Sequence, residues 1–131
     1  MDIKILITEI LLSIFLGGSL GWQRQHIGKT AGFRTFAIIT VASMLVTRLS
    51  SQAFGQDPAR VAAQILTGIG FIGAGIIIHK KDTVEGLTTA AGFWAAAAIG
   101  MAIGAGWYIE SIIVTISLFL LLVLPDKKII K

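Results

Sequence analysis

Five apolar segments alternate with short polar connections along the chain. They run over residues 3–22, 33–49, 61–78, 87–104 and 107–124. Each is close to the roughly twenty residues that a helix needs to cross the hydrocarbon core of a bilayer. The pattern predicts an all-α membrane protein. Residues 1–126 would form a bundle of about five transmembrane helices, and residues 127–131 would form a short basic cytoplasmic tail.

The third segment raises a competing interpretation, because Gly68, Gly70 and Gly73 match the dinucleotide-binding pattern G-x-G-x-x-G. That pattern requires a strand before it, a helix after it and an acidic residue about twenty positions further on. Here the glycines lie inside an uncharged apolar run, and the sequence about twenty positions on holds no carboxylate. A membrane span is therefore favoured over a nucleotide site.

Composition supports the membrane interpretation. Hydrophobic residues make up 55% of the 131 positions and charged residues only 14%, against about 25% charged in a soluble domain. The chain has no cysteine, which excludes disulfides and thiolate metal sites. The net charge of +4 does not predict a nucleic-acid partner, because the basic residues flank apolar segments instead of forming a patch.

Basic residues divide unequally between the two predicted sides of the membrane. One side holds Arg24, Lys29, Arg34, Lys80, Lys81, Lys127, Lys128 and Lys131, and the other holds Lys4, Arg48 and Arg60. Cytoplasmic loops carry an excess of Lys and Arg, so we expect the N-terminus outside and the C-terminus in the cytoplasm. The alternative that residues 3–22 are a cleaved signal would leave four spans, but Glu9 lies inside this segment and the apolar stretch is long for a signal.

Small residues recur at helical spacing in the third segment. Ala63, Thr67, Gly70 and Ala74 have this spacing, and Gly68, Gly73 and Gly75 complete the small-residue set of the segment. Such faces let helix backbones approach closely in lipid, so we expect a helix-packing surface, either within the chain or across a homodimer. The alternative is a locally unwound helix at residues 68–75 that lines an ion or substrate cavity, as broken helices do in transporters.

Polar residues within or beside the spans form a second candidate group. They are Glu9, Arg48, Arg60, Gln64 and Glu110, all in the predicted outer half. An unpaired charge in a membrane is costly, so one interpretation is a compensating network in which Glu9 pairs with Arg48 or Arg60. The other is an outward-facing vestibule in which Glu9 or Glu110 meets a cation.

At the predicted cytoplasmic face, Arg24 and Arg34 are expected to meet anionic lipid or, alternatively, a docking partner. Thr88 and Thr89 follow Gly86, and we expect them to cap the fourth helix or to contribute hydroxyls to a polar pocket. The sequence holds no catalytic triad, paired carboxylates or phosphate-binding loop, so no enzymatic activity is expected. Two histidines do not make a metal site, and none is assigned.

Several blocks of sequence together resemble the MgtC/SapB family of bacterial membrane proteins. They are residues 21–25 (GWQRQ), 31–35 (AGFRT), 60–64 (RVAAQ), 68–75 (GIGFIGAG) and 84–91 (VEGLTTAA), together with Trp94. They follow the family's order and cover about residues 17–106. Two features depart from the family. Gln23 stands where its members usually carry Glu, and larger members continue into a soluble C-terminal domain.

The resemblance implies an inner-membrane protein linked to magnesium homeostasis and to stress or virulence adaptation. Members resemble modulators of other membrane proteins more than established magnesium transporters. We therefore expect a non-enzymatic regulator that contacts the lipid bilayer, a second copy of itself and other membrane proteins. The alternative is a small transporter or channel for Mg²⁺ or another solute. No cofactor is expected, and Mg²⁺ is the one ion that the resemblance brings into consideration.

Overall fold

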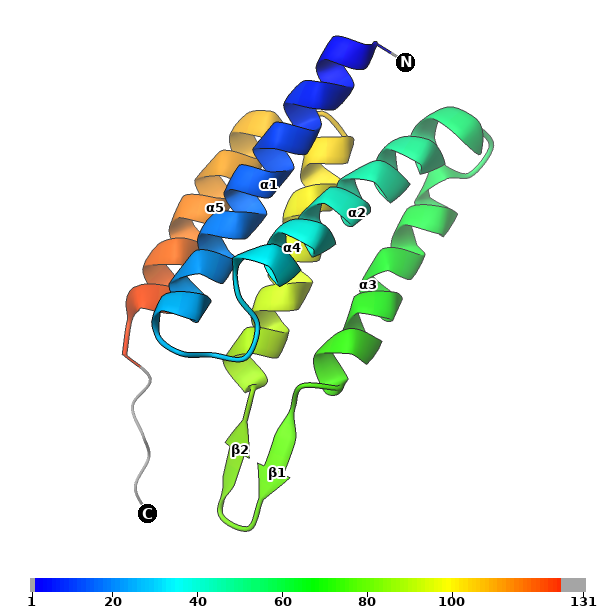
Figure 1. Cartoon of the computed structure of the whole chain (residues 1–131). Helices are drawn as coiled ribbons and strands as arrows, with labels where there is room; N and C mark the ends of the chain where they lie inside the picture. The colour runs from blue at the N-terminus through cyan, green and yellow to red at the C-terminus, as the bar shows by residue number, and fades with distance from the viewer. Residues whose placement is uncertain (1, 126–131) are drawn as a thin grey trace.

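The computed structural model describes residues 2–125, which form five helices and one β-hairpin (Figure 1). In chain order the elements are α1 (Ile3–His26), α2 (Phe33–Ala53), α3 (Pro58–Ala74), β1 (Ile78–Lys80), β2 (Thr83–Glu85), α4 (Leu87–Gly104) and α5 (Tyr108–Val123). The helices run alternately up and down. The N-terminus and the α2–α3 and α4–α5 connections lie at one end of the bundle, and the α1–α2 loop and the hairpin lie at the other (Figure 1).

The expectation of an all-α membrane bundle is confirmed. By length and composition, α1, α2 and α4 are long and apolar enough to cross a membrane. The other two helices are shorter, with 17 residues in α3 and 16 in α5, and α5 is apolar. Large apolar side chains such as Phe15 and Ile113 are exposed on the outside of the bundle, which suits a surface that faces lipid.

The core lies where α2 packs between α1 and α4. Phe36 and Phe93 are buried there and meet edge to face, with 5.3 Å between their ring centroids. Glycines bring these helices together. A Cβ added at Gly17 would collide with the Thr40 side chain, and one added at Gly100 would collide with the Thr40 carbonyl. The chain thus packs through small residues, but the closest approaches are on α1 and α4.

The third element differs most from its predicted range of 61–78. Its helix begins earlier, at Pro58, whose fixed φ suits a first helical position. It also ends earlier, at Ala74. Ile78, predicted to lie in the span, belongs instead to a strand that the sequence analysis did not foresee. The alternative of an unwound segment at 68–75 is also wrong, because α3 stays helical to Ala74.

The hairpin after α3 is short and exposed. Ile78 pairs with Glu85 and Lys80 pairs with Thr83 in an antiparallel register. The run of three isoleucines at 76–78 favours extended backbone. Gly86 closes the hairpin with φ +84°, and a Cβ there would collide with the Ile76 carbonyl. The isoleucine run and the conformation of Gly86 explain why the apolar segment leaves the helix and forms a hairpin.

The remaining bounds differ less. α4 has the predicted range of 87–104, and α5 is one residue shorter at each end than the predicted 107–124. α1 extends to His26 and α2 to Ala53, four residues beyond the predicted ends in each case. Polar residues such as Gln and Arg are good helix formers, so the loss of hydrophobicity did not mark the helix ends. The predicted basic tail at 127–131 lies outside the described residues.

Candidate functional site

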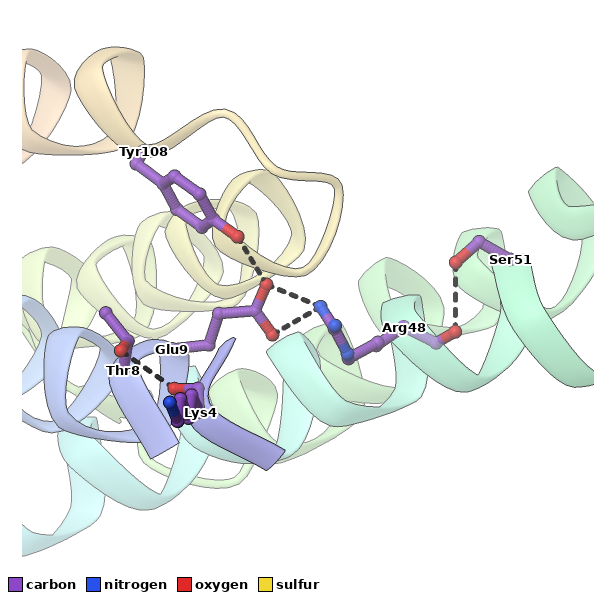
Figure 2. Close-up of polar contacts among 6 residues, drawn as sticks. All are labelled: Lys4, Thr8, Glu9, Arg48, Ser51 and Tyr108. Atoms are coloured by element: carbon purple, nitrogen blue, oxygen red, sulfur yellow. Dashed lines mark hydrogen bonds and ion pairs between the residues drawn. The ribbon is translucent and has the colours of Figure 1, made fainter. Parts of the chain in front are cut away.

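A buried carboxylate lies at the end of the bundle that carries the N-terminus. Glu9 of α1 is 0% exposed. Arg48 of α2 donates from one terminal nitrogen to both of its oxygens, at 2.5 Å to Oε1 and 2.6 Å to Oε2. The hydroxyl of Tyr108, the first residue of α5, donates to Oε1 at 2.6 Å (Figure 2). Three helices therefore converge on one carboxylate, and we call these three residues the Glu9 cluster.

The ends of two helices position the partners of Glu9. α2 continues beyond its predicted end at residue 49 to Ala53, more than a turn past Arg48, and so holds the arginine within the bundle. Gly106 adopts φ +87° in the turn before α5, a conformation that favours glycine. That turn reverses the chain between α4 and α5 and places Tyr108 above the carboxylate (Figure 2).

Three buried hydrogen-bonding atoms close in sequence to Glu9 or Arg48 have no partner among the described residues. They are Ser13 Oγ, Thr47 Oγ1 and Arg48 Nε. Ser13 lies one helical turn after Glu9, and Thr47 precedes Arg48. Buried polar groups are normally hydrogen-bonded, so these three atoms have unused hydrogen-bonding capacity.

The charges of the Glu9 cluster balance each other. One carboxylate meets one guanidinium, and both carboxylate oxygens accept hydrogen bonds. A cation at Glu9 would have to displace Arg48. Within residues 2–125, no group of three or more His, Cys, Asp or Glu side chains is placed to hold a metal ion. The arrangement neutralises a charge and ties helices together.

The other members of the predicted outer network lie apart from Glu9. Arg60, Gln64 and Glu110 are exposed on α3 and α5. The hydrogen bonds that the described residues make to Glu9 come from Arg48 and Tyr108. Of the two pairings that the sequence left open, the structure therefore shows Glu9 with Arg48 and not with Arg60.

The sequence alone does not mark Tyr108 as a partner of Glu9, because a tyrosine at a span end is typical of the headgroup layer. No local signal could have shown its role, because Tyr108 reaches Glu9 only through the packing of α5 against α1. For Ser13 the sequence does give a signal, since it is four residues after Glu9 and so on the same helix face.

At the opposite end of the bundle, Arg24 of α1 is 3% exposed. Its guanidinium donates to Thr89 Oγ1 of α4 at 3.1 Å, so the structure brings two predicted residues together. The neighbouring Gln23 donates from Nε2 to the Leu122 carbonyl of α5 at 2.8 Å. Arg34 is exposed at the start of α2, and Thr88 is partly buried. Both predicted threonines thus lie in the first turn of α4, where Thr89 contacts Arg24.

The small residues of α3 lie mostly outside the chain's own packing. Only Gly73 of the predicted set is buried, where a Cβ would sit 3.6 Å from Ala90 Cβ. A Cβ at Gly68 or Gly70 would meet nothing within 4 Å. The exposed members of the set that share one side of α3, which we call the α3 face, are Ala63, Thr67, Gly70 and Ala74. Gly68 and Gly75 are exposed on another side of the chain at this helix. The expected packing of the set within the chain is therefore wrong except at Gly73.

Comparison with known proteins identifies relatives over most of the chain. The model of the MgtC family matches residues 10–128. The chain is 44% identical over 111 residues to the protein of Escherichia coli strain K12 named putative magnesium transporter YhiD, covering 78% of the chain and 52% of that protein. It is 42% identical over 105 residues to protein MgtC of Brucella abortus strain 2308, covering 79% of the chain and 44% of that protein.

A third relative, protein SapB of Bacillus subtilis strain 168, is 37% identical over 116 residues, covering 81% of the chain and 50% of that protein. The chain thus spans about half the length of the curated relatives that it matches. No solved structure matches it.

Proposed function

The chain belongs to the MgtC family, and on that premise we propose that it is a non-enzymatic inner-membrane protein of magnesium homeostasis or stress adaptation that acts by contact with other membrane proteins. The resemblance drawn from the sequence is confirmed. One relative of the chain is named putative magnesium transporter YhiD. A regulator that acts by contact needs a surface at which membrane helices can meet, and the α3 face is such a surface, in the first place for a second copy of the chain.

The α3 face is the observation that carries this proposal. Elsewhere in the bundle, glycines at close helix contacts are covered by another helix, as Gly17 and Gly100 are by α2. Gly70, by contrast, is a helical glycine of the α3 face with open space beside it. Glycine in a helix is unfavourable by about 1 kcal/mol relative to alanine, and close backbone approach is what offsets this in membranes. A second copy of α3 is the occupant that we expect.

The Glu9 cluster supports a regulator over a transporter. Its carboxylate is engaged by Arg48 and Tyr108, and it therefore offers no free oxygen pair to an ion. One observation favours the alternative of a small transporter for Mg²⁺ or another solute. Ser13 and Thr47 carry buried hydroxyls without a partner among the described residues, on the two helices that supply the ion pair, and a polar path would need such groups.

Reconstitution separates the two functions. The purified chain in liposomes with an internal magnesium dye is expected to give no more Mg²⁺ influx than protein-free liposomes. Influx that requires the protein and falls in Glu9→Gln would instead establish the transporter.

The contact surface is tested by cross-linking in the membrane. Gly70→Leu should abolish the cross-linked dimer, because a leucine prevents close approach of two α3 helices. Ser117→Leu adds similar bulk on the exposed side of α5 and should leave the dimer intact. An unchanged dimer in Gly70→Leu would refute the assignment of the α3 face.

A further inference from the structure

A cavity of about 370 Å³ lies at the end of the bundle that carries the hairpin. Its walls come from the end of α1, the α1–α2 loop, the hairpin and the start of α4. The polar residues that line it are Arg24, Lys29, Thr30, Glu85, Thr88 and Thr89. The volume falls within the range of about 300–1,000 Å³ that is usual for small-molecule pockets. The cavity is at the opposite end of the bundle from the Glu9 cluster.

Among the described residues that line the cavity, positive charge exceeds negative charge. The guanidinium of Arg24 is almost fully buried in the wall, and Lys29 is exposed at the rim. Glu85 is the one carboxylate in the described lining, and Lys80 holds it at 2.7 Å. The bond to Lys80 and, more weakly, the charge of Lys29 lower the pKa of Glu85. Glu85 thus stays ionised, with Lys80 as its counter-charge from outside the cavity.

The start of α4 adds hydrogen-bond donors to the same cavity. Gly86 is the N-cap residue and provides no side-chain cap, and the first turn holds no acidic residue. The amide groups at a helix start attract anions, and phosphate binds at such positions. Thr88 and Thr89 add hydroxyls from this turn, and Thr89 already accepts a hydrogen bond from Arg24. The buried arginine is the independent feature, because it comes from α1 and not from the helix start.

These groups suit a tetrahedral oxyanion. Arg offers several fixed donors to phosphate oxygens, Lys adds a point charge, and amide and hydroxyl groups accommodate the remaining oxygens. We propose that this cavity binds a phosphate group, carried by a phospholipid headgroup or by a soluble phosphate compound. The inference does not depend on the proposed regulatory function, since it concerns neither the α3 face nor magnesium flux.

Native mass spectrometry of the full chain in a phosphate-free maltoside detergent tests the proposal with two probes. One is phosphatidylglycerol and the other is inorganic phosphate. We expect at least one probe to bind. Lys29→Gln should weaken that binding about tenfold, the usual consequence of losing one charge-assisted hydrogen bond. Thr88→Val removes a hydroxyl without changing charge and should weaken it by a smaller factor.

Lys81→Gln is the matched control, because it removes an exposed lysine from the hairpin turn outside the cavity lining. It should change binding less than twofold. Binding of phosphatidylglycerol alone would identify a headgroup site, and binding of inorganic phosphate would identify a soluble ligand. The proposal is overturned if neither probe binds, if Lys29→Gln binds as well as the native chain, or if Lys81→Gln weakens binding equally.

Discussion

At the scale of single residues, the Glu9 cluster shows how a membrane bundle accommodates a charge. Moving an ion pair out of water is unfavourable, and mutual attraction offsets this only when the geometry and the hydrogen bonds are good. Here Arg48 reaches both oxygens of Glu9, and Tyr108 adds a third hydrogen bond. The cluster therefore depends on both charged partners being present, and this dependence can be measured.

Removal of one partner should be far worse than removal of both. Arg48→Met leaves the Glu9 carboxylate buried without a counter-charge and is expected to lower the free energy of unfolding by about 3–5 kcal/mol. The double variant Glu9→Gln, Arg48→Met removes both charges and should recover most of this loss. Thermal unfolding in detergent measures both. If the two variants are equally unstable, the ion pair is not what the cluster contributes.

The tyrosine is expected to contribute one hydrogen bond. Tyr108→Phe removes its donor to the carboxylate and should lower the free energy of unfolding by about 1.5–3 kcal/mol, the usual contribution of a bond to a charged group. Tyr108 is the sole tyrosine in the chain, so its fluorescence gives no readout in the variant, and circular dichroism is the suitable measurement. No loss of stability would mean that the hydroxyl bonds Glu9 weakly.

At the scale of elements, glycines in similar sequence settings have opposite roles. Gly100 lies against the α2 backbone, whereas Gly70 has nothing within 4 Å. Gly100→Ala should destabilise the chain by about 1–3 kcal/mol, as overpacking does. Gly70→Ala should raise the stability of the detergent-solubilised monomer by up to about 1 kcal/mol, because alanine is the better helix former. Thermal unfolding of both variants under the same conditions tests these two expectations. A destabilised Gly70→Ala would contradict the exposed position of Gly70.

The hairpin gives a pH-dependent prediction. The pKa of Glu85 is lowered by its bond to Lys80 and by the charge of that lysine. A carboxyl whose pKa is lower in the folded state contributes stability above its unfolded pKa and loses it as the pH falls through the folded pKa. The Glu85 resonance in an NMR titration should thus shift at a lower pH than that of an ordinary glutamate. In Lys80→Gln its pKa should rise to the ordinary range, and an unchanged titration would exclude the pair.

The element scale also shows what the sequence could and could not predict. Hydrophobic length located all five helices and gave α4 its bounds, because an apolar run bounded by polar residues is a local signal. The small-residue pattern on α3 predicted close packing, but the pattern is equally present on α1 and α4 and does not say which helix is covered. The hairpin at 78–85 was missed because three isoleucines read equally well as span or strand.

At the scale of the whole molecule, the two polar sites lie at opposite ends of the bundle. Glu9 could be proposed from sequence because a charge in a span needs a partner. The choice of Arg48 over Arg60, and the arrival of Tyr108, required the tertiary arrangement of three helices. The pairing of Arg24 with Thr89, 65 positions apart, is likewise a product of packing that no local pattern encodes.

The end that carries the hairpin should face the cytoplasm. In the described chain this end holds Arg24, Lys29, Arg34, Lys80 and Lys81, and the other end holds Lys4, Arg48 and Arg60. The excess of basic residues favours retention in the cytoplasm. Because the chain has no cysteine, single cysteines can be introduced at will. In intact cells of a bacterial expression host, a membrane-impermeant thiol reagent should label Gln56→Cys, in the α2–α3 connection, and should label Lys81→Cys only after the membrane is opened. The reverse pattern would invert the orientation, and it would place the proposed phosphate cavity on the outer side of the membrane.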